Sequence, residues 1–366
     1  MVAFRDDFEA LLAATYSSAL DAKELIFTPS EIHHSIETEF DVEFDVTYAP
    51  ALAKKPHGIL EIVEEDQACT GTSRPSTPVV RNVQKSNPFL PHTPALFVTD
   101  AGENHKILLN KFCIVPEHFL IVTKEFRPQT QPLSPQDLLT AWRSLKALPA
   151  HPESIVFFNC GTKAGASQPH KHLQVIPLKN GQPTPITKLV RRTLKARRGP
   201  STIHPGQLFS VAFDCIHHLI LFPQLPSDAS EEDEEEMLVK TYISLMDAML
   251  ESLREEYATQ HHLSEEERLQ SAGALSSLSY NWIMTREFML IAPRRQEGYG
   301  PLNINSLGFA GMVLAKTADE LKVVKRLGVV GTVSKTGFQI KNEEEARAAE
   351  AKKQEEQAYF DQRIRK

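Results

Sequence analysis

Two histidines and a glutamine alternate along the short stretch His170–Gln174, which reads His-Lys-His-Leu-Gln. The residues that follow are apolar and β-branched up to Pro177, so the stretch predicts a strand. Side chains alternate between the two faces of a strand, so His170, His172 and Gln174 share one face. The other face receives Lys171, Leu173 and Val175, of which the last two can pack into a core. A neutral imidazole is a nucleophile near pH 7, and its attack on phosphorus gives a phosphoramidate.

The segment just before this strand, Gly161–Gln168, consists mainly of small residues. Its backbone N–H groups and hydroxyls could hold an anion. Glycine and serine mark any turn, so this signal is weak alone. Together with the histidine pair it favours phosphate chemistry.

A metal site is the main alternative for the histidine pair. Zinc takes four ligands, or three and a water molecule, and a third ligand could come from another histidine. The cysteines are scattered and form no Cys-x-x-Cys pair, which disfavours this alternative; they are Cys69, Cys113, Cys160 and Cys215. The pair His217-His218 is a weaker candidate, because adjacent residues of a strand point to opposite faces. We therefore expect no metal at the histidine row, which consists of His170, His172 and Gln174.

The segment Gln168–Gln174, with the opening Asn159–Gly161 and the run Gly165–Gln168, resembles the active-site strand of the transferase branch of the histidine-triad superfamily. It is most similar to the fungal diadenosine tetraphosphate phosphorylases, also called ATP adenylyltransferases. The resemblance runs from about residue 40 to about residue 325. It implies an α+β fold of histidine-triad-like antiparallel sheets with flanking helices.

The resemblance also assigns roles to individual residues. It implies that His172 is the nucleophile, that His170 orients it and that Gln174 stabilises the intermediate. It implies the following substrate-binding residues: Lys54, Asn87, Pro88, Asn159, Gly165, Ala166, Ser167, Gln168, Asn281, Met284 and Arg286. Judged by residue type alone, Lys54 is an ordinary solvated lysine and Asn87-Pro88 an ordinary turn.

The reaction implied is phosphorolysis of diadenosine tetraphosphate by inorganic phosphate, which gives ATP and ADP through an AMP–His172 intermediate. A glutamine cannot act as an acid near neutral pH but can donate a hydrogen bond to a phosphoryl oxygen, which suits transfer better than hydrolysis. We expect no covalent cofactor, whereas a divalent cation such as Mg²⁺ could take part. Three alternatives stay open: a hexose-1-phosphate uridylyltransferase, a dinucleoside polyphosphate hydrolase, and a non-enzymatic nucleotide- or metal-binding module.

Composition limits the partners and the compartment. The chain has 366 residues, 41% hydrophobic and 24% charged, with a net charge of −7. That balance disfavours nucleic acid and anionic membranes as partners. No run of 18 apolar residues occurs, the N-terminus does not read as a signal peptide, and unpatterned cysteines indicate a reducing compartment. We expect a cytoplasmic protein, with a nuclear location also open; the oligomeric state is not predicted.

The remaining pattern predicts the elements around the site. Strands or hairpins are expected at 40–48, 112–115 with 119–123, 155–158, 209–213, 217–222 and 279–294. Helices are expected at 4–25, from Ser134 onward, at 188–198, after the acidic run 231–236, at 306–316 and at 319–327. The hairpins around Phe119 and Phe288 look like a degenerate repeat, so we expect two related halves. The predicted division is a catalytic domain at 1–200, a second domain at 205–330 and a charged tail at 342–366.

Overall fold

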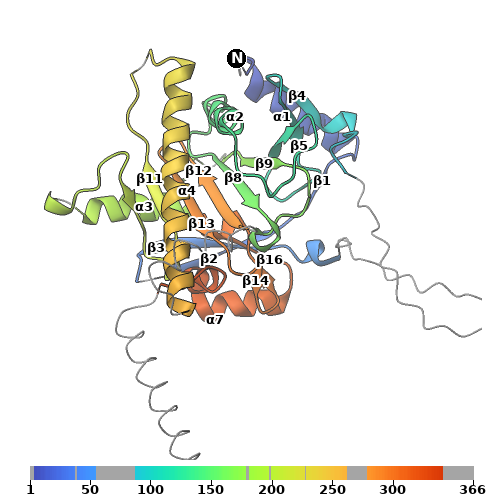
Figure 1. The fold of residues 1–366 in the computed structure, drawn as a ribbon. Helices are drawn as coiled ribbons and strands as arrows, with labels where there is room; N and C mark the ends of the chain where they lie inside the picture. The colour runs from blue at the N-terminus through green and yellow to red at the C-terminus, as the bar shows by residue number, and fades with distance from the viewer. Residues whose placement is uncertain are drawn as a thin grey trace, which may run out of the picture.

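The structure is a computed structural model that describes residues 4–37, 39–54, 87–178, 181–197, 199–226, 228–261 and 278–340. Every structural statement below concerns these residues. The charged tail expected at 342–366 lies outside them. The α+β class is confirmed, since sheets and helices both build the fold (Figure 1).

A nine-stranded sheet forms the centre of the molecule, with the strand order β10-β11-β13-β12-β8-β9-β7-β5-β4. All eight pairings in this sheet are antiparallel. Its strands are β4 (Phe97–Ala101), β5 (His105–Leu109), β7 (Phe119–Thr123), β8 (Ile155–Cys160), β9 (His172–Ile176), β10 (Leu208–Phe209), β11 (His218–Leu221), β12 (Tyr280–Met284) and β13 (Phe288–Pro293).

Smaller sheets and the helices surround this sheet. The smaller sheets pair β1 (Ile26–Phe27) with β6 (Phe112–Cys113), join β2 (Glu31–Glu37), β3 (Val42–Tyr48) and β16 (Met312–Ala315), and pair β14 (Gly298–Tyr299) with β15 (Leu302–Asn303). The α-helices are α1 (Phe8–Asp21), α2 (Pro135–Lys146), α3 (Pro185–Ala196), α4 (Glu231–His261), α6 (Ser306–Phe309) and α7 (Ala318–Ser334). Short 3₁₀ turns lie at η1 (Pro50–Lys54), η2 (Pro94–Leu96), η3 (Thr162–Ala164) and η4 (Gly199–Ser201).

The two faces of the large sheet pack into different cores. One core contains Phe119, Phe158, Leu173 and Trp282 and is covered by α1, α2 and the long helix α4, which crosses the sheet in Figure 1. The other core lies on the opposite face in the C-terminal half and is covered by α3, α6, α7 and the sheet of β3. In the N-terminal half this core reaches β8 and the end of β9, and beyond them the face carries a small apolar cluster with Phe89, Leu108, Leu120 and Val122. This face is therefore the one that can expose polar side chains.

The expected internal repeat exists, with a different alignment. A hairpin, a helix and a second hairpin follow one another twice, as β5-β7, α2, β8-β9 and as β10-β11, α4, β12-β13. The spatial orders 5-7-9-8 and 10-11-13-12 match, and the halves join where β8 pairs with β12. β13 thus corresponds to β9, and β7 corresponds to β11. The predicted match of Phe119 with Phe288 was wrong, because it aligned the second strand of one half with the fourth of the other.

The hairpin expected between 112–115 and 119–123 was also wrong. β6 pairs with β1 in parallel, and β7 pairs with β5, whose residue Leu109 lies opposite Phe119. The physical reason is that all five residues of β5 are buried and Ile107–Leu109 are apolar, whereas Phe112 in β6 is 43% exposed at the surface. The hairpin at 279–294 is confirmed as β12-β13.

Local signals place the helices. Ser134 accepts a hydrogen bond from the backbone N–H of Asp137, whose carboxylate accepts from the N–H of Ser134, so α2 begins with the expected cap and proline. The acidic run 231–236 does not precede α4 but forms its first turns, where carboxylates favour the positive end of the helix dipole. One short helix, α6, and the strand β16 stand where a single helix was expected at 306–316, because Gly311 has φ +83° between them.

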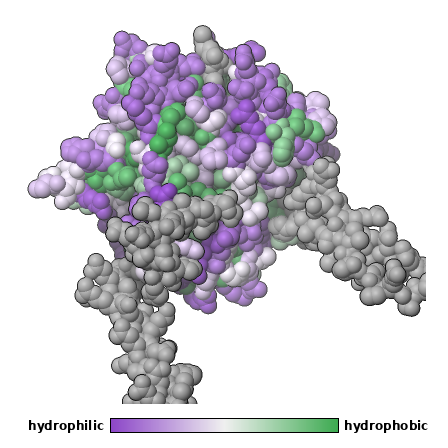
Figure 2. Space-filling view, in the orientation of Figure 1, coloured by the Kyte–Doolittle hydropathy of each residue, from purple (hydrophilic) through white to green (hydrophobic). Residues whose placement is uncertain are grey.

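The surface of the described residues is mostly hydrophilic in the view of Figure 2, with separate small apolar patches. Among the described residues, no helix combines the length and the apolar character that crossing a membrane requires.

Candidate active site

The histidine row lies on the face of the nine-stranded sheet that is less covered in the N-terminal half. β9 begins at His172, and His170 precedes the strand at an isolated bridge with Pro128. The Phe89 ring lies 5.6 Å from the His170 ring and 5.3 Å from the His172 ring, so both imidazoles are on the same side of the chain, as predicted. Gln174 is half-buried on this face, between Leu120 of β7 and Phe157 of β8. The row is thus supported by a rigid central strand.

The protonation of His172 is set by the backbone. Its Nδ1 lies 2.8 Å from the carbonyl oxygen of His170, which can only accept, so Nδ1 carries the proton. Burial lowers the pKa of His172 to about 4, which keeps the imidazole neutral at physiological pH. The lone pair on Nε2 is therefore free to attack, which is the state that a histidine nucleophile needs.

His170 contacts the His172 ring through its carbonyl oxygen, not through its own ring. Its Nε2 lies 2.9 Å from the carbonyl oxygen of Thr123 and 3.1 Å from that of Glu125, so Nε2 carries the proton. Its Nδ1 then accepts a hydrogen bond of 2.9 Å from the Nδ2 of Asn87. Burial lowers the pKa of His170 as well, which keeps the ring neutral. The ring thus holds the turn before β9 in place.

The segment Asn87–Phe89 is held over the row from two sides. Asn87 accepts a hydrogen bond of 3.0 Å from the N–H of Phe89 and uses its other amide end on His170. The buried Lys106 donates to the carbonyl oxygen of Phe89 at 2.7 Å. Pro88 between them is exposed. The predicted residues Asn87 and Pro88 therefore border the row.

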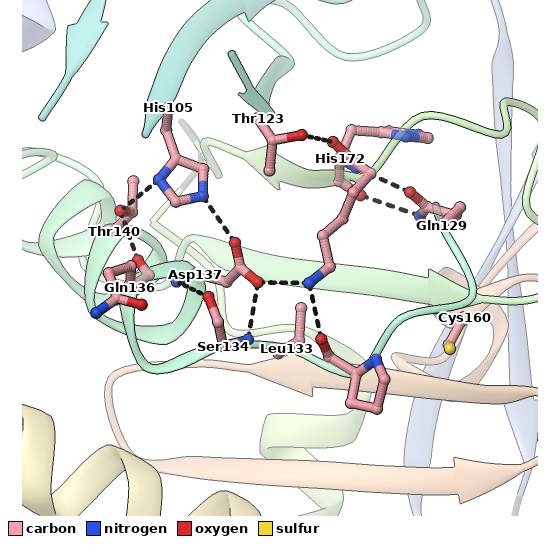
Figure 3. Close-up of polar contacts among 12 residues, drawn as sticks. His105, Thr123, Gln129, Leu133, Ser134, Gln136, Asp137, Thr140, Cys160 and His172 are labelled. Atoms are coloured by element: carbon pink, nitrogen blue, oxygen red, sulfur yellow. Dashed lines mark hydrogen bonds and ion pairs between the residues drawn. The ribbon is translucent and has the colours of Figure 1, made fainter. Parts of the chain in front are cut away.

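Gln129 holds the start of β9 (Figure 3), and the sequence analysis missed it. Its Oε1 accepts from the N–H of His172 at 2.8 Å, and its Nε2 donates to the carbonyl oxygens of His172 and Asn159 at 3.1 and 3.0 Å. One buried side chain thereby fixes the backbone of His172 against β8. A glutamine in a proline-rich loop carries no sequence signal for such a position.

A buried ionic network lies behind the row, on the opposite face of the strand (Figure 3). The Nζ of Lys171 lies 2.7 Å from Asp137 Oδ2 and 2.7 Å from the carbonyl oxygen of Pro132. Asp137 Oδ1 lies 2.7 Å from His105 Nε2, and His105 Nδ1 lies 3.2 Å from Thr140 Oγ1. Hydrogen bonding by His105 and the charge of Lys171 outweigh burial and hold the pKa of the Asp137 carboxyl well below its usual range. The network ties the turn before β9 to α2.

The glycine loop keeps its donors free. Gly165 has φ +81°, and a Cβ there would lie 3.0 Å from the Cβ of Asn305 and 3.1 Å from the carbonyl oxygen of Ile304, so the turn requires glycine. Ser167 is exposed, and Ala166 and Gln168 are half-buried. No described residue accepts a hydrogen bond from the backbone N–H groups of 166–168. These groups remain available to an anion beside the row.

Asn159 and Asn281 join the two halves of the sheet. They lie opposite each other on β8 and β12, and Asn159 Oδ1 accepts hydrogen bonds from Asn281 and Ser306. The Oδ1 of Asn281 accepts from Arg294, a buried cation that the sequence analysis missed and whose pKa burial lowers to about 10. Asn281 is fully buried and its amide has polar partners at both ends, whereas Asn159 Nδ2 has no partner among the described residues. Asn281 therefore supports the site from below, and Asn159 retains a donor.

Two of the predicted substrate-binding residues are not brought to the row. Met284 is fully buried in the core on the opposite face of β12. Arg286 follows it in the β12-β13 turn and donates to the carbonyl oxygens of Leu145 and Leu148 at the end of α2. Both carbonyl oxygens also accept from backbone N–H groups, and the cation adds a second donor at the negative end of the helix. Lys54 ends η1, and its side chain lies outside the described part of the structure.

The metal alternative finds no ligand cluster in the described part of the chain. No group of three or more His, Cys, Asp or Glu side chains there could hold a metal ion. Cys113, Cys160 and Cys215 are buried and form no disulfide, and burial raises the pKa of Cys160 to about 11 and of Cys215 to about 12; Cys69 lies outside the described residues. His217 donates from Nδ1 to the carbonyl oxygen of Cys215 and accepts at Nε2 from Val211. Both of its nitrogens are therefore committed to the backbone.

Comparison with known proteins connects this geometry to a family. Residues 15–192 match the protein family described as "Ap4A phosphorylase N-terminal domain", where Ap4A is diadenosine tetraphosphate. Residues 210–339 match the family described as "ATP adenylyltransferase C-terminal domain". The chain is 30% identical to diadenosine 5',5'''-P1,P4-tetraphosphate phosphorylase 2 of Saccharomyces cerevisiae over 76% of this chain and 78% of that protein. It is 30% identical to Protein APA1 of the same yeast over 85% and 87% of the two chains. The crystal structure of yeast Ap4A phosphorylase Apa2 in complex with Ap4A matches with a TM-score of 0.68 and 25% identity, over 93% of this chain and 100% of that one. The chain therefore belongs to the Ap4A phosphorylase family.

Proposed function

We propose that this chain catalyses phosphorolysis of Ap4A by inorganic phosphate, giving ATP and ADP through an adenylyl group on His172. The single observation that carries the proposal is the fixed tautomer of His172, whose Nδ1 proton is held by the carbonyl oxygen of His170 at 2.8 Å. Family membership supplies the substrate, since a yeast relative has been crystallised with Ap4A.

The reaction divides into two balanced steps. In the first, Nε2 of His172 attacks a terminal α-phosphorus of Ap4A, the P–O bond to the β-phosphate breaks, and ATP leaves with the bonding electron pair. In the second, an oxygen of inorganic phosphate attacks the same phosphorus, the P–N bond breaks, and ADP leaves. The sum is Ap4A plus phosphate to ATP plus ADP.

The residues around His172 have separate tasks in this scheme. Backbone donors at 166–168 and the hydroxyl of Ser167 hold phosphoryl oxygens, and the Gln174 amide donates to the oxygens that gain charge. ATP is a stable polyphosphate anion as a leaving group, so no general acid is needed beside it. A divalent cation such as Mg²⁺ would enter with the polyphosphate, which is its usual ligand in nucleotide sites.

The proposal is tested by product analysis. Purified protein is incubated with Ap4A, with and without inorganic phosphate, and ATP, ADP and AMP are separated by chromatography. We expect equal amounts of ATP and ADP, dependent on phosphate. AMP with ATP would instead indicate hydrolysis, and turnover of a UDP-sugar but not Ap4A would indicate the uridylyltransferase alternative. Binding of Ap4A without any product would indicate the non-enzymatic alternative.

A further inference from the structure

The contribution of Gln174 to transfer of the adenylyl group depends on which end of its amide faces the phosphoryl oxygens. The NH₂ end donates a hydrogen bond, whereas the oxygen end would repel a phosphoryl oxygen. The two ends have nearly the same size, so shape alone does not select one of them. A neighbouring group must therefore hold the amide in one orientation.

His118 is placed to do this. It lies two residues before Leu120, which pairs directly with Gln174, so both side chains point to the same face of the sheet. His118 is only 6% exposed, and its ring lies 6.2 Å from that of Phe157, which pairs with Gln174 from the other side. From this placement we infer a hydrogen bond between the two side chains, and Gln174 accordingly acts to raise the pKa of His118 against the effect of burial.

The direction of this hydrogen bond follows from Asn110. The Oδ1 of Asn110 accepts from the backbone N–H of Phe112 at 3.2 Å, so its Nδ2 is the end that faces His118. That Nδ2 lies 3.2 Å from Nδ1 of His118 and 3.5 Å from Nε2. An amide NH₂ only donates, so Nδ1, the nearer nitrogen, accepts and the ring proton is on Nε2.

The neutral ring then has one proton left to donate. Burial lowers the pKa of His118 to about 4, so a second proton is absent near pH 7. The remaining proton is on Nε2, and it is the one that the ring can donate to the amide oxygen of Gln174.

We propose that His118 is a positioning residue that binds the oxygen of the Gln174 amide and thereby turns its NH₂ group toward the phosphoryl oxygens on His172. This inference rests on the proposed function and deepens it. The position that holds a histidine in other histidine rows is a glutamine here, and His118 of the neighbouring strand gives that glutamine one orientation.

The second half of the molecule supplies a matched control. His217 immediately precedes β11, as His118 precedes β7, and the two strands correspond in the repeat. His217 is 2% exposed and its pKa is lowered to about 4 by burial, but its hydrogen bonds go to Cys215 and Val211. It shares burial with His118 and has no contact with the row.

The experiment measures kcat and KM for Ap4A in five variants, of which Gln174→Ala is the reference for the double variant. His118→Leu should lower kcat about 5- to 10-fold with little change in KM, because one orienting hydrogen bond is lost. His118→Gln keeps a donor at this place and should stay within about twofold of the wild type. In the Gln174→Ala background, His118→Leu should cause no further loss of kcat, because the group that it positions is gone. His217→Leu should lower stability and leave the kcat of the folded enzyme unchanged.

A measurement on the unaltered protein keeps the inference testable even where His118→Leu does not fold. Nitrogen-15 NMR of the imidazoles, assigned with His118→Gln, should show His118 as the Nε2–H tautomer. The Nδ1–H tautomer would overturn the inference, and so would a wild-type kcat in His118→Leu or an equal loss in the Gln174→Ala background. Failure of the proposed function is a separate result, since the wild type itself would then form no ATP and ADP.

Discussion

At the scale of single residues, the site depends on hydrogen bonds that select one tautomer or one amide orientation. His172 keeps its proton on Nδ1 because a carbonyl faces it, and His170 keeps its proton on Nε2 for the same reason. Neither ring carries a charge at neutral pH, because burial lowers both pKa values. The neutral state and the tautomer of His172, which the proposed attack requires, are therefore set by the fold around the row.

In the proposed mechanism, Gln174 determines whether phosphate or water accepts the adenylyl group. Gln174→Ala removes one donor to the phosphoryl oxygens, so the rate should fall by about 10²–10³ while Ap4A still binds. Gln174→His introduces a group that titrates near neutrality, so AMP should increase relative to ADP. The AMP-to-ADP ratio at fixed phosphate measures both variants. An unchanged ratio in Gln174→His, with an unchanged rate in Gln174→Ala, would assign Gln174 to packing alone.

The pH dependence of the first step reports the protonation of His172. Attack requires the unprotonated Nε2, and burial lowers the pKa of His172 to about 4. The single-turnover rate with Ap4A should therefore stay constant from pH 8 down to about 5 and fall below that, since protonation then removes the nucleophile. The internal phosphates of Ap4A lack the second ionisation near pH 6 of a terminal phosphate, so the substrate does not obscure the profile. An acid limb centred near 6.5 would contradict the neutral, buried state.

At the scale of elements, β9 is held from both faces. Gln129 and the Asn87–Phe89 segment hold it on the side of the row, and the pair of Lys171 and Asp137 ties it to α2 on the other. Both members of this pair are essentially unexposed, so neither charge can be satisfied by water when its partner is removed.

Lys171→Met tests this anchor. It leaves the carboxylate of Asp137 buried without its cation, so the free energy of unfolding should fall by about 3–5 kcal/mol. The control is Lys124→Met, which breaks a 3.0 Å pair with Asp100 in which the side chains are 35% and 61% exposed. That change should cost less than about 1 kcal/mol. Urea unfolding of the two variants gives the comparison, and equal losses would show that burial of the ion pair is not what matters.

Local signals in the sequence predicted the elements better than their partners. The cap Ser134-Pro135 with Asp137 placed the start of α2, because every group involved lies within one turn. The partner of β7 was missed, because strand pairing depends on burial at a distance and both candidate segments were apolar. Likewise the residue types of the row predicted its chemistry, whereas Gln129 and His118 reach it from other segments and carry no local pattern. Met284 and Arg286 were predicted only from the family resemblance. The alternation of side chains along β12 directs Met284 into the opposite core, and the carbonyl oxygens at the end of α2 hold Arg286.

At the scale of the whole molecule, two related halves share one sheet and one site. The second half covers its corresponding face with the core of α3, α6 and α7, so only the first half leaves that face to polar residues. The Asn159–Asn281 contact joins the halves directly below the glycine loop, since Asn281 also donates to the carbonyl oxygen of Ala164. The second half thus supports the site of the first.

Buried histidines in both halves make the fold sensitive to acid. His118, His172 and His217 have pKa values near 4 in the folded chain, against about 6.5 when unfolded. The unfolded chain therefore binds more protons between these values, so stability is present above pH 6.5 and is lost as the pH falls toward 4, by about 3 kcal/mol per histidine. Three such losses rival the whole stability of a typical protein. The midpoint of thermal unfolding should fall steeply from pH 7 to pH 4.5, less so in His217→Gln, and a flat profile would contradict the burial of neutral histidines.

The most direct test of the account is to detect the covalent intermediate. The protein is mixed with Ap4A without phosphate, and its intact mass and the mass of the peptide containing residue 172 are measured. We expect one adenylyl group per chain on His172, labile in acid, released as ADP when phosphate is added, and absent in His172→Ala. A chain that forms ATP and ADP from Ap4A and phosphate but never carries the adenylyl group, or that carries it with His172 replaced, would contradict the account.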